Sequence, residues 1–230
     1  AAGIREPKDL RGKRVGIPKY HMTAAVWIRG ILEDEYGVAP KEMLWFEGGE
    51  GAKVKEVDVT LPPQIRMEHV PGDRNLGDMV AGGELDAFIG ARRPAAFGKG
   101  ISRLFPDFRK AERAYYEKTA IFPIMHTVVL KEELVTQHPW LPRTLYTAFA
   151  EAKQLAYRRL NDTAALLTSL PWQVAEAEET RALMGDDPFA YGIAKNRKTV
   201  ETLAGYSFRQ GLAPRRLTIE DLFVPSMLDT

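Results

Sequence analysis

The stretch VGIPKYHMTAAVWIRGIL, residues 15–32, decides the fold. It joins a short apolar strand to a helix through a proline, an aromatic residue, a histidine and a threonine. Such a junction is a common anion site, because the first-turn amides of a helix are unpaired and its dipole favours negative charge there. An ordinary strand-to-helix loop with Thr23 as the N-cap explains the same residues. Both interpretations predict a βα unit.

The hydrophobic pattern extends this unit in both directions. It predicts a strand over residues 14–17, a helix over 23–36 that ends at Gly37, and a second strand over 43–49. A strand, a helix and a strand in this order favour a right-handed crossover between parallel strands. The helix residues expected to face the core are Val26, Trp27, Gly30, Ile31 and Leu32.

In the rest of the chain, predicted strands and helices alternate first, and predicted helices dominate after that. Residues 50–71 have no steady hydrophobic period, which predicts a long loop with one edge strand. The remaining predicted elements are a helix over 76–82, strands over 87–89 and 124–130, helices over 109–118, 142–160, 162–170, 172–184 and 195–210, and a turn near Glu220. Since a lone strand is unstable, we expect two α/β lobes, of which the second has an incomplete sheet in this chain.

The composition excludes several classes of function. The 230 residues are 45% hydrophobic, and 32 Lys and Arg balance 31 Asp and Glu, so we expect no nucleic-acid partner. A small anionic ligand stays possible. The chain has no cysteine, which removes thiol nucleophiles and thiolate metal sites and leaves the redox compartment open. No apolar window is long enough to predict membrane insertion, and the N-terminal residues lack the pattern of a secretory signal.

Polar residues follow two of the predicted strands. Arg92 and Arg93 come directly after the strand over 87–89, and Tyr20, His21 and Thr23 follow the first strand. Open α/β sheets bind ligands at this end of their strands, and guanidinium groups match carboxylates. The sequence therefore predicts substrate-binding residues here; the alternative is a pair of solvated arginines in a loop.

The other candidates are more isolated. His126 falls inside the predicted strand over 124–130, where it is either a core residue or a catalytic group. Arg197 begins a helix, as a second anion contact or a surface arginine. The four histidines lack metal-binding spacing, so we expect no metal. The glycine-rich residues 48–53 lack the Lys-Ser/Thr pair of a phosphate loop.

Four blocks of the sequence resemble the 4,5-dihydroxyphthalate decarboxylase family. This family is itself similar to type 2 periplasmic binding proteins of the thiamine-precursor-binding kind. The blocks keep their order and are GIREPKDLRGKRVGIPKYHMTAAVWIRGILEDEYGV (3–38), LGDMVAGGELDAFIGARRP (76–94), FPIMHTVVLKEEL with HPWLPRTLYTAFAEAK (122–153), and YGIAKNRKTVETLAGYSFRQGL (191–212).

The resemblance implies a fold of two α/β lobes with the ligand in the cleft between them. Residues 1–118 then form one complete lobe, lobe two, and residues 119–230 return to lobe one with one strand and the C-terminal helices. The opening part of lobe one is then absent from this chain.

The resemblance also implies a reaction. A ring hydroxyl para to the departing carboxylate pushes electron density onto the carbon that loses it, and protonation there releases carbon dioxide without a cofactor. Position then suggests roles: Arg92, Arg93 and the helix start at Thr23 bind carboxylates, and Tyr20 and His21 orient the ring. His126 is either the proton donor or the base for a ring hydroxyl.

A solute-binding protein has the same expected fold. It would deliver a small anionic or aromatic compound to the permease of an ABC transporter, with the same arginines binding the ligand. The enzyme interpretation goes with a cytoplasmic location and the transport interpretation with a periplasmic one. The sequence leaves the oligomeric state open.

Overall fold

The chain divides into two compact units. The computed structural model describes residues 3–48 and 60–230. Unit 1 comprises Ala1–Glu112 and Thr202–Leu217, and unit 2 comprises Arg113–Glu201 and Thr218–Thr230. The assignment of residues 1–118 and 119–230 to lobes of a larger fold stays a prediction.

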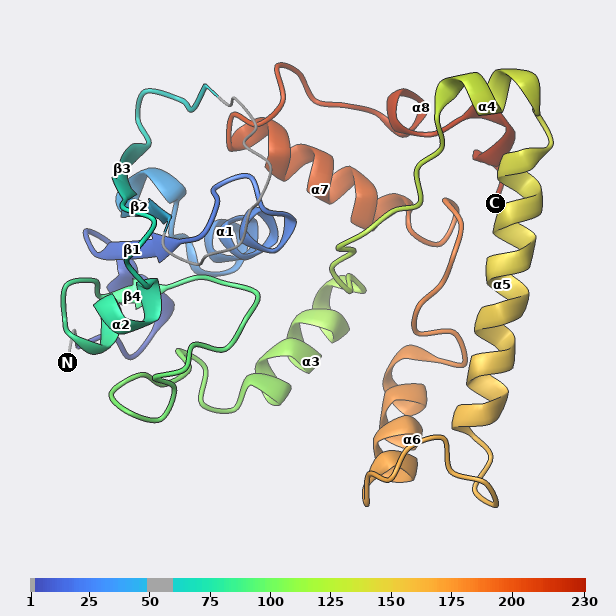
Figure 1. The fold of residues 1–230 in the computed structure, drawn as a ribbon, viewed down its shortest axis with the longest axis horizontal. Coiled ribbons are helices and arrows are strands. Elements are labelled where there is room, and N and C mark those ends of the chain that lie inside the picture. The colour runs from blue at the N-terminus through green and yellow to red at the C-terminus, as the bar shows by residue number, and fades with distance from the viewer. Residues whose placement is uncertain (1–2, 49–59) are drawn as a thin grey trace. The chain divides into compact units, whose positions relative to one another are not determined.

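A four-stranded parallel sheet forms the centre of unit 1 (Figure 1). Its strands are β1 (Arg14–Ile17), β2 (Leu44–Gly48), β3 (Arg66–Val70) and β4 (Ala87–Phe88), in the order β3-β2-β1-β4. All three pairings are parallel, and Val15 lies opposite both Trp45 and Ala87. The predicted α/β class and the predicted edge strand, β3, are confirmed. Residues 49–59 of the predicted loop, which include most of the glycine-rich stretch, lie outside the described residues.

Helix α1 (Thr23–Tyr36) connects β1 to β2 and matches its predicted bounds. It ends at Gly37, whose φ of 67° is left-handed and suits glycine. α2 (Leu76–Ala81) precedes β4, and the short 3₁₀ helices η1 (Pro7–Leu10) and η2 (Pro40–Glu42) precede β1 and β2. The core of the unit contains Val15, Ile17, Met43 and Trp45, which have no exposed surface.

The C-terminal half of α7 (Arg197–Arg209) packs on α1 within unit 1. A Cβ atom on Gly30 would lie 2.3 Å from the ring of Tyr206, so only glycine allows this approach. Trp27 meets the same ring edge-on, at 5.5 Å between ring centroids. The chain thus returns to cover α1, and this return brings Gln210, directly after α7, to the buried face of α1.

Unit 2 is helical in its described residues. Its helices are the second part of α3 (Phe108–Thr119), α4 (Glu132–Gln137), α5 (Leu141–Leu160), α6 (Gln173–Met184), the start of α7 and α8 (Ile219–Leu222), followed by η3 (Pro225–Met227). No helix in the described ranges is both long and apolar enough to cross a membrane.

Two predicted elements in unit 2 are wrong. Residues 124–130 form no strand, and Val128 and Val129 are 67% and 83% exposed. A strand needs a neighbour to accept its hydrogen bonds, and no strand lies in unit 2, all of which is described. Residues 162–170 form no helix, because Asp162 accepts hydrogen bonds from the amides of Ala164 and Ala165 and so favours a local turn.

Candidate functional site

The carboxyl edge of the sheet in unit 1 is the candidate site. The chain runs outward from β1 to β2 and β3 and then returns to β4 on the other side of β1. The direction of strand order therefore reverses between β1 and β4, and open parallel sheets bind their ligands at such a switch point. The amide of Ile89 continues the pairing by donating to the carbonyl of Gly16 (2.9 Å). The segments that follow β1 and β4 thus leave the sheet as neighbours.

The segment after β1, Pro18 to Met22, is held in place through Tyr20. The Tyr20 amide donates to Oε2 of Glu47 (2.7 Å), and its carbonyl accepts from Nη2 of Arg29 (2.6 Å). The Tyr20 ring is buried and meets Trp45 edge-on. Its side chain therefore faces the core, which differs from the predicted contact with a substrate ring, because the apolar surface of Trp45 and the guanidinium of Arg29 cover it.

Helix α1 begins without a side-chain cap. Its N-cap residue is Met22, and Thr23 is the first helical residue, so the predicted cap at Thr23 is wrong by one position. The first turn contains no acidic residue. Within the described residues, no acidic side chain of this turn and no side-chain cap neutralises its amides and the positive end of the helix dipole, which suits an anion. His21, half-buried, lies one residue before the N-cap of this helix.

The segment after β4 presents two arginines. Arg92 and Arg93 are exposed, and in the described part of the chain neither forms an ion pair. The Arg93 guanidinium lies 5.4 Å from the ring centroid of Phe97. Gly90 turns the chain where a Cβ atom would lie 2.2 Å from the ring of Phe88. Two free guanidinium groups at this edge can bind carboxylates.

The structure adds two residues that sequence reasoning missed at this edge. Glu47, at the end of β2, has a side chain only 12% exposed and lies 3.4 Å from Nζ of Lys19. Nδ1 of His69, on β3, lies 4.0 Å from Glu47. The signal was present in the sequence, because both residues end strands just as Tyr20 and Arg92 follow them. Glu47 links the ends of β1, β2 and β3.

Arg29 was also missed. It lies on the buried face of α1, three residues after Val26 and three before Leu32, and its side chain has no exposed surface. Ile31, which we expected to face the core, is only partly buried. The helical spacing placed Arg29 within the apolar stripe, but arginine is almost never fully buried.

Unit 2 contains the two remaining predicted site residues. His126 is exposed in the irregular segment that follows α3. Arg197, at the start of α7, pairs with Glu201 (3.2 Å) and lies 4.0 Å from Glu220. Its guanidinium is therefore already engaged by carboxylates, as expected for a surface arginine.

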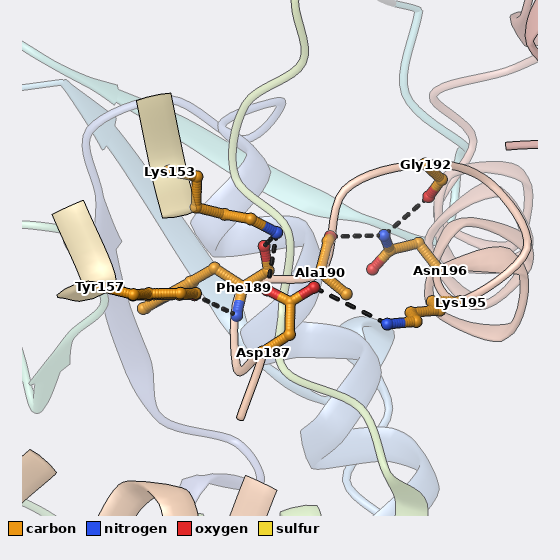
Figure 2. A network of polar contacts seen from close by, with 8 residues as sticks. All are labelled: Lys153, Tyr157, Asp187, Phe189, Ala190, Gly192, Lys195 and Asn196. Carbon is orange, nitrogen blue, oxygen red and sulfur yellow. Dashed lines mark hydrogen bonds and ion pairs between the residues drawn. The ribbon is translucent and has the colours of Figure 1, made fainter. Parts of the chain in front are cut away.

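A polar network of unit 2 joins α5 to the segment before α7 (Figure 2). The Lys153 ammonium, on a side chain 9% exposed, donates to Asp187 (2.6 Å) and to the Phe189 carbonyl (2.9 Å). It also lies 4.3 Å from the ring centroid of Tyr191. Asn196 donates to two carbonyls of its own loop. These contacts fix the loop on α5 and engage the Lys153 ammonium with a carboxylate, a carbonyl and a ring, as in a structural network.

An open depression of about 430 Å³ lies beside this network. It contains none of the residues predicted for the site, and its Arg181 already contacts Asn161 and Asp186. Within residues 3–48 and 60–230, no three His, Asp or Glu side chains are grouped as metal ligands. The carboxyl edge of the sheet therefore stays the candidate.

Comparisons with known proteins identify the family. No model of a known protein family matches the chain. A 4,5-dihydroxyphthalate decarboxylase of Comamonas testosteroni is 39% identical over 233 residues, which is 99% of this chain and 71% of that protein. A 4,5-dihydroxyphthalate decarboxylase of Pseudomonas putida is 38% identical over 119 residues, 50% of this chain and 46% of that protein. The chain belongs to the 4,5-dihydroxyphthalate decarboxylase family.

Proposed function

We propose that this chain removes one carboxylate of 4,5-dihydroxyphthalate as carbon dioxide and leaves protocatechuate. The observation that carries the proposal is the 39% identity, over 99% of the chain, with a protein of that name. The two-lobe fold of the type 2 periplasmic-binding-protein kind is part of the proposal, and the parallel sheet of unit 1 is consistent with it. The enzyme interpretation goes with the cytoplasm, and the compartment stays a prediction.

The substrate's charge suggests how it is anchored. A phthalate carries two adjacent carboxylates, and the switch point between β1 and β4 offers two kinds of cationic partner. We assign one carboxylate to Arg92 and Arg93 and the other to the uncapped first turn of α1, with His21 and Thr23 beside it. Charge-assisted hydrogen bonds of this kind each contribute about 1.5–3 kcal/mol. Arg197 is left out, because it already pairs with Glu201.

The reaction balances with a single proton. A hydroxyl para to the departing carboxylate supplies electron density to the ring carbon that bears it, and that carbon accepts a proton. The carbon–carbon bond then breaks, its electron pair returns to the ring, and carbon dioxide leaves. Bound cations hold both carboxylates of the dianion in place while the ring carbon is protonated. His126 stays the predicted proton donor, and cofactor independence belongs to this proposal.

The experiment is a product assay. The chain is incubated with 4,5-dihydroxyphthalate, and carbon dioxide and protocatechuate are measured together, with and without a chelator. Equal amounts of the two products support the proposal, and loss of both with chelator would add a metal requirement. Binding without product would favour the solute-binding interpretation.

A further inference from the structure

A buried arginine without a carboxylate partner lies under the β1–α1 loop. Nε of Arg29 donates to Oε1 of Gln210 (2.8 Å), and Nη2 donates to the Tyr20 carbonyl (2.6 Å). Nη1 has no hydrogen-bond partner among residues 3–48 and 60–230. In the ranges that the structure describes, no carboxylate pairs with this guanidinium. Burial lowers the pKa of Arg29 to about 10, so the side chain stays charged at neutral pH.

The stability of the fold does not explain why a charged side chain is buried at position 29. Burial of a cation is costly, and an apolar side chain of similar volume often serves the fold equally well. Arg29 receives only partial compensation, from the face of the Tyr20 ring (3.6 Å to the centroid), from Trp45 (5.6 Å) and from the longer-range attraction of the Glu47 carboxylate. The amide of Gln210 fixes the guanidinium while donating to the Val26 carbonyl (2.9 Å). The position therefore holds a charge in a set orientation.

The contacts of Arg29 converge on one residue. The backbone of Tyr20 makes a hydrogen bond on each side: its amide donates to Glu47, and its carbonyl accepts from Arg29. His21 is the next residue, and the first turn of α1 begins three positions after Tyr20. We call Tyr20, Arg29, Glu47 and Gln210 the Tyr20 clamp. The clamp sets the direction in which the loop presents its amides.

We propose that Arg29 is a positioning residue for anion binding at the carboxyl edge of the sheet. It acts through the Tyr20 clamp, which fixes the loop, and through its positive charge, which no carboxylate of the described residues pairs directly and which adds to the dipole of α1. The inference rests on the proposed function, because it takes the ligand to be an aromatic dicarboxylate. It assigns the discrimination between charged and neutral ligands to a group that does not touch the ligand.

The test compares two ligands and three variants of the 230-residue chain. Phthalate carries the two carboxylates, and catechol carries only the two hydroxyls. Arg29→Met removes the positive charge at similar side-chain volume. Arg29→Lys keeps the charge but lacks the planar guanidinium that donates to Gln210 and Tyr20 at the same time. Arg14→Met is the matched control, because Arg14 lies at the opposite end of β1, where it makes a bidentate pair with Asp86 (3.0 and 2.9 Å). Calorimetry gives each dissociation constant, and thermal unfolding is measured alongside.

Arg29→Met is expected to raise the phthalate dissociation constant about tenfold and leave that of catechol unchanged. Arg29→Lys is expected to restore most of the loss, within about threefold of wild type. Arg14→Met is expected to lower the melting temperature without changing the dissociation constant of phthalate or of catechol. Where Arg29→Met does not fold, Arg29→Gln, which also removes the charge, takes its place in the test with the same expected result.

Three results would overturn the proposal. These are unchanged phthalate binding in both Arg29 variants, an equal loss for phthalate and catechol that tracks the fall in melting temperature, and no phthalate binding by the wild-type chain. The decarboxylase proposal is judged separately by product formation. If phthalate binding depends on Arg29 but 4,5-dihydroxyphthalate is not turned over, the decarboxylase proposal is contradicted. The positioning role of Arg29 is then still supported.

Discussion

The guanidinium of Arg29 lies 3.6 Å from the ring centroid of Tyr20 and holds the carbonyl of the same residue. Tyr20 is thereby fixed at its ring and at its backbone, while its buried hydroxyl has no hydrogen-bond partner in the described part of the chain. The sequence predicted one role, substrate binding, for Tyr20 and its neighbours, and this relationship gives Tyr20 a structural role instead. Tyr20 supports the loop from inside, whereas Lys19 before it pairs with Glu47 and His21 after it is half-buried.

The Tyr20 hydroxyl is expected to add nothing to stability. Tyr20→Phe removes a buried donor that has no acceptor, so the free energy of unfolding should stay the same or rise by about 1 kcal/mol. Tyr20→Ala, which removes the whole buried ring, should cost about 3–5 kcal/mol. Urea denaturation measures both. A clear loss of stability in Tyr20→Phe would show that the hydroxyl has a partner.

The arginines after β4 are expected to bind a carboxylate. Arg92→Ala or Arg93→Ala should weaken phthalate binding by about 1.5–3 kcal/mol, the range for a charge-assisted hydrogen bond. Arg66→Ala is the control, because Arg66 is exposed at the start of β3, on the opposite edge of the sheet. Titration calorimetry gives the affinities. Wild-type affinity in both variants would remove these arginines from the site.

Glu47 places a negative charge near the proposed anion site. Glu47→Gln keeps an oxygen that can accept from the Tyr20 amide and removes the charge that faces Lys19. Phthalate should then bind more tightly, by about 0.3–1 kcal/mol, because the repulsion is gone. Gln in place of Glu68, which is exposed one residue before His69 on β3, is the control. Weaker phthalate binding in Glu47→Gln would instead give the carboxylate a direct role.

His126 is expected to matter for turnover alone. It is exposed and lies outside any helix or strand, so His126→Gln should leave the melting temperature and phthalate binding unchanged while abolishing protocatechuate formation. His138→Gln, another exposed histidine of unit 2, is the control. Retained turnover in His126→Gln would assign the proton to another group, with His21 and His69 the next to substitute.

Acid should weaken the amino edge of the sheet. The Arg14 guanidinium holds the pKa of Asp86 below its usual value of 3.8. A carboxylate with a depressed folded-state pKa stabilises the fold above the unfolded-state value, and the contribution is lost as the pH falls through the folded-state pKa. The stability difference between wild type and Asp86→Asn should therefore be largest near pH 7 and narrow below pH 3.8. A difference that does not change with pH would contradict the pairing.

Local patterns predicted unit 1 well. β1 and α1 have their expected bounds because a short apolar run, a clean helical stripe and a left-handed Gly37 are all local signals. The carboxyl edge was predicted from strand ends alone. The clamp was not, because it depends on Gln210, which comes 181 positions after Arg29. The wrong strand over 124–130 has a similar origin, since propensity cannot show whether a partner strand exists.

The most direct test of the central claim follows the reaction in D₂O. Protonation of the carbon that loses its carboxylate predicts protocatechuate with one deuterium at ring carbon 6, para to its 3-hydroxyl, and one carbon dioxide for each product molecule. Proton NMR shows the missing signal, and a sample without the protein controls for exchange in solvent. Appearance of this singly deuterated product would establish the decarboxylase. Unchanged 4,5-dihydroxyphthalate in the presence of a folded chain that binds it would contradict the claim.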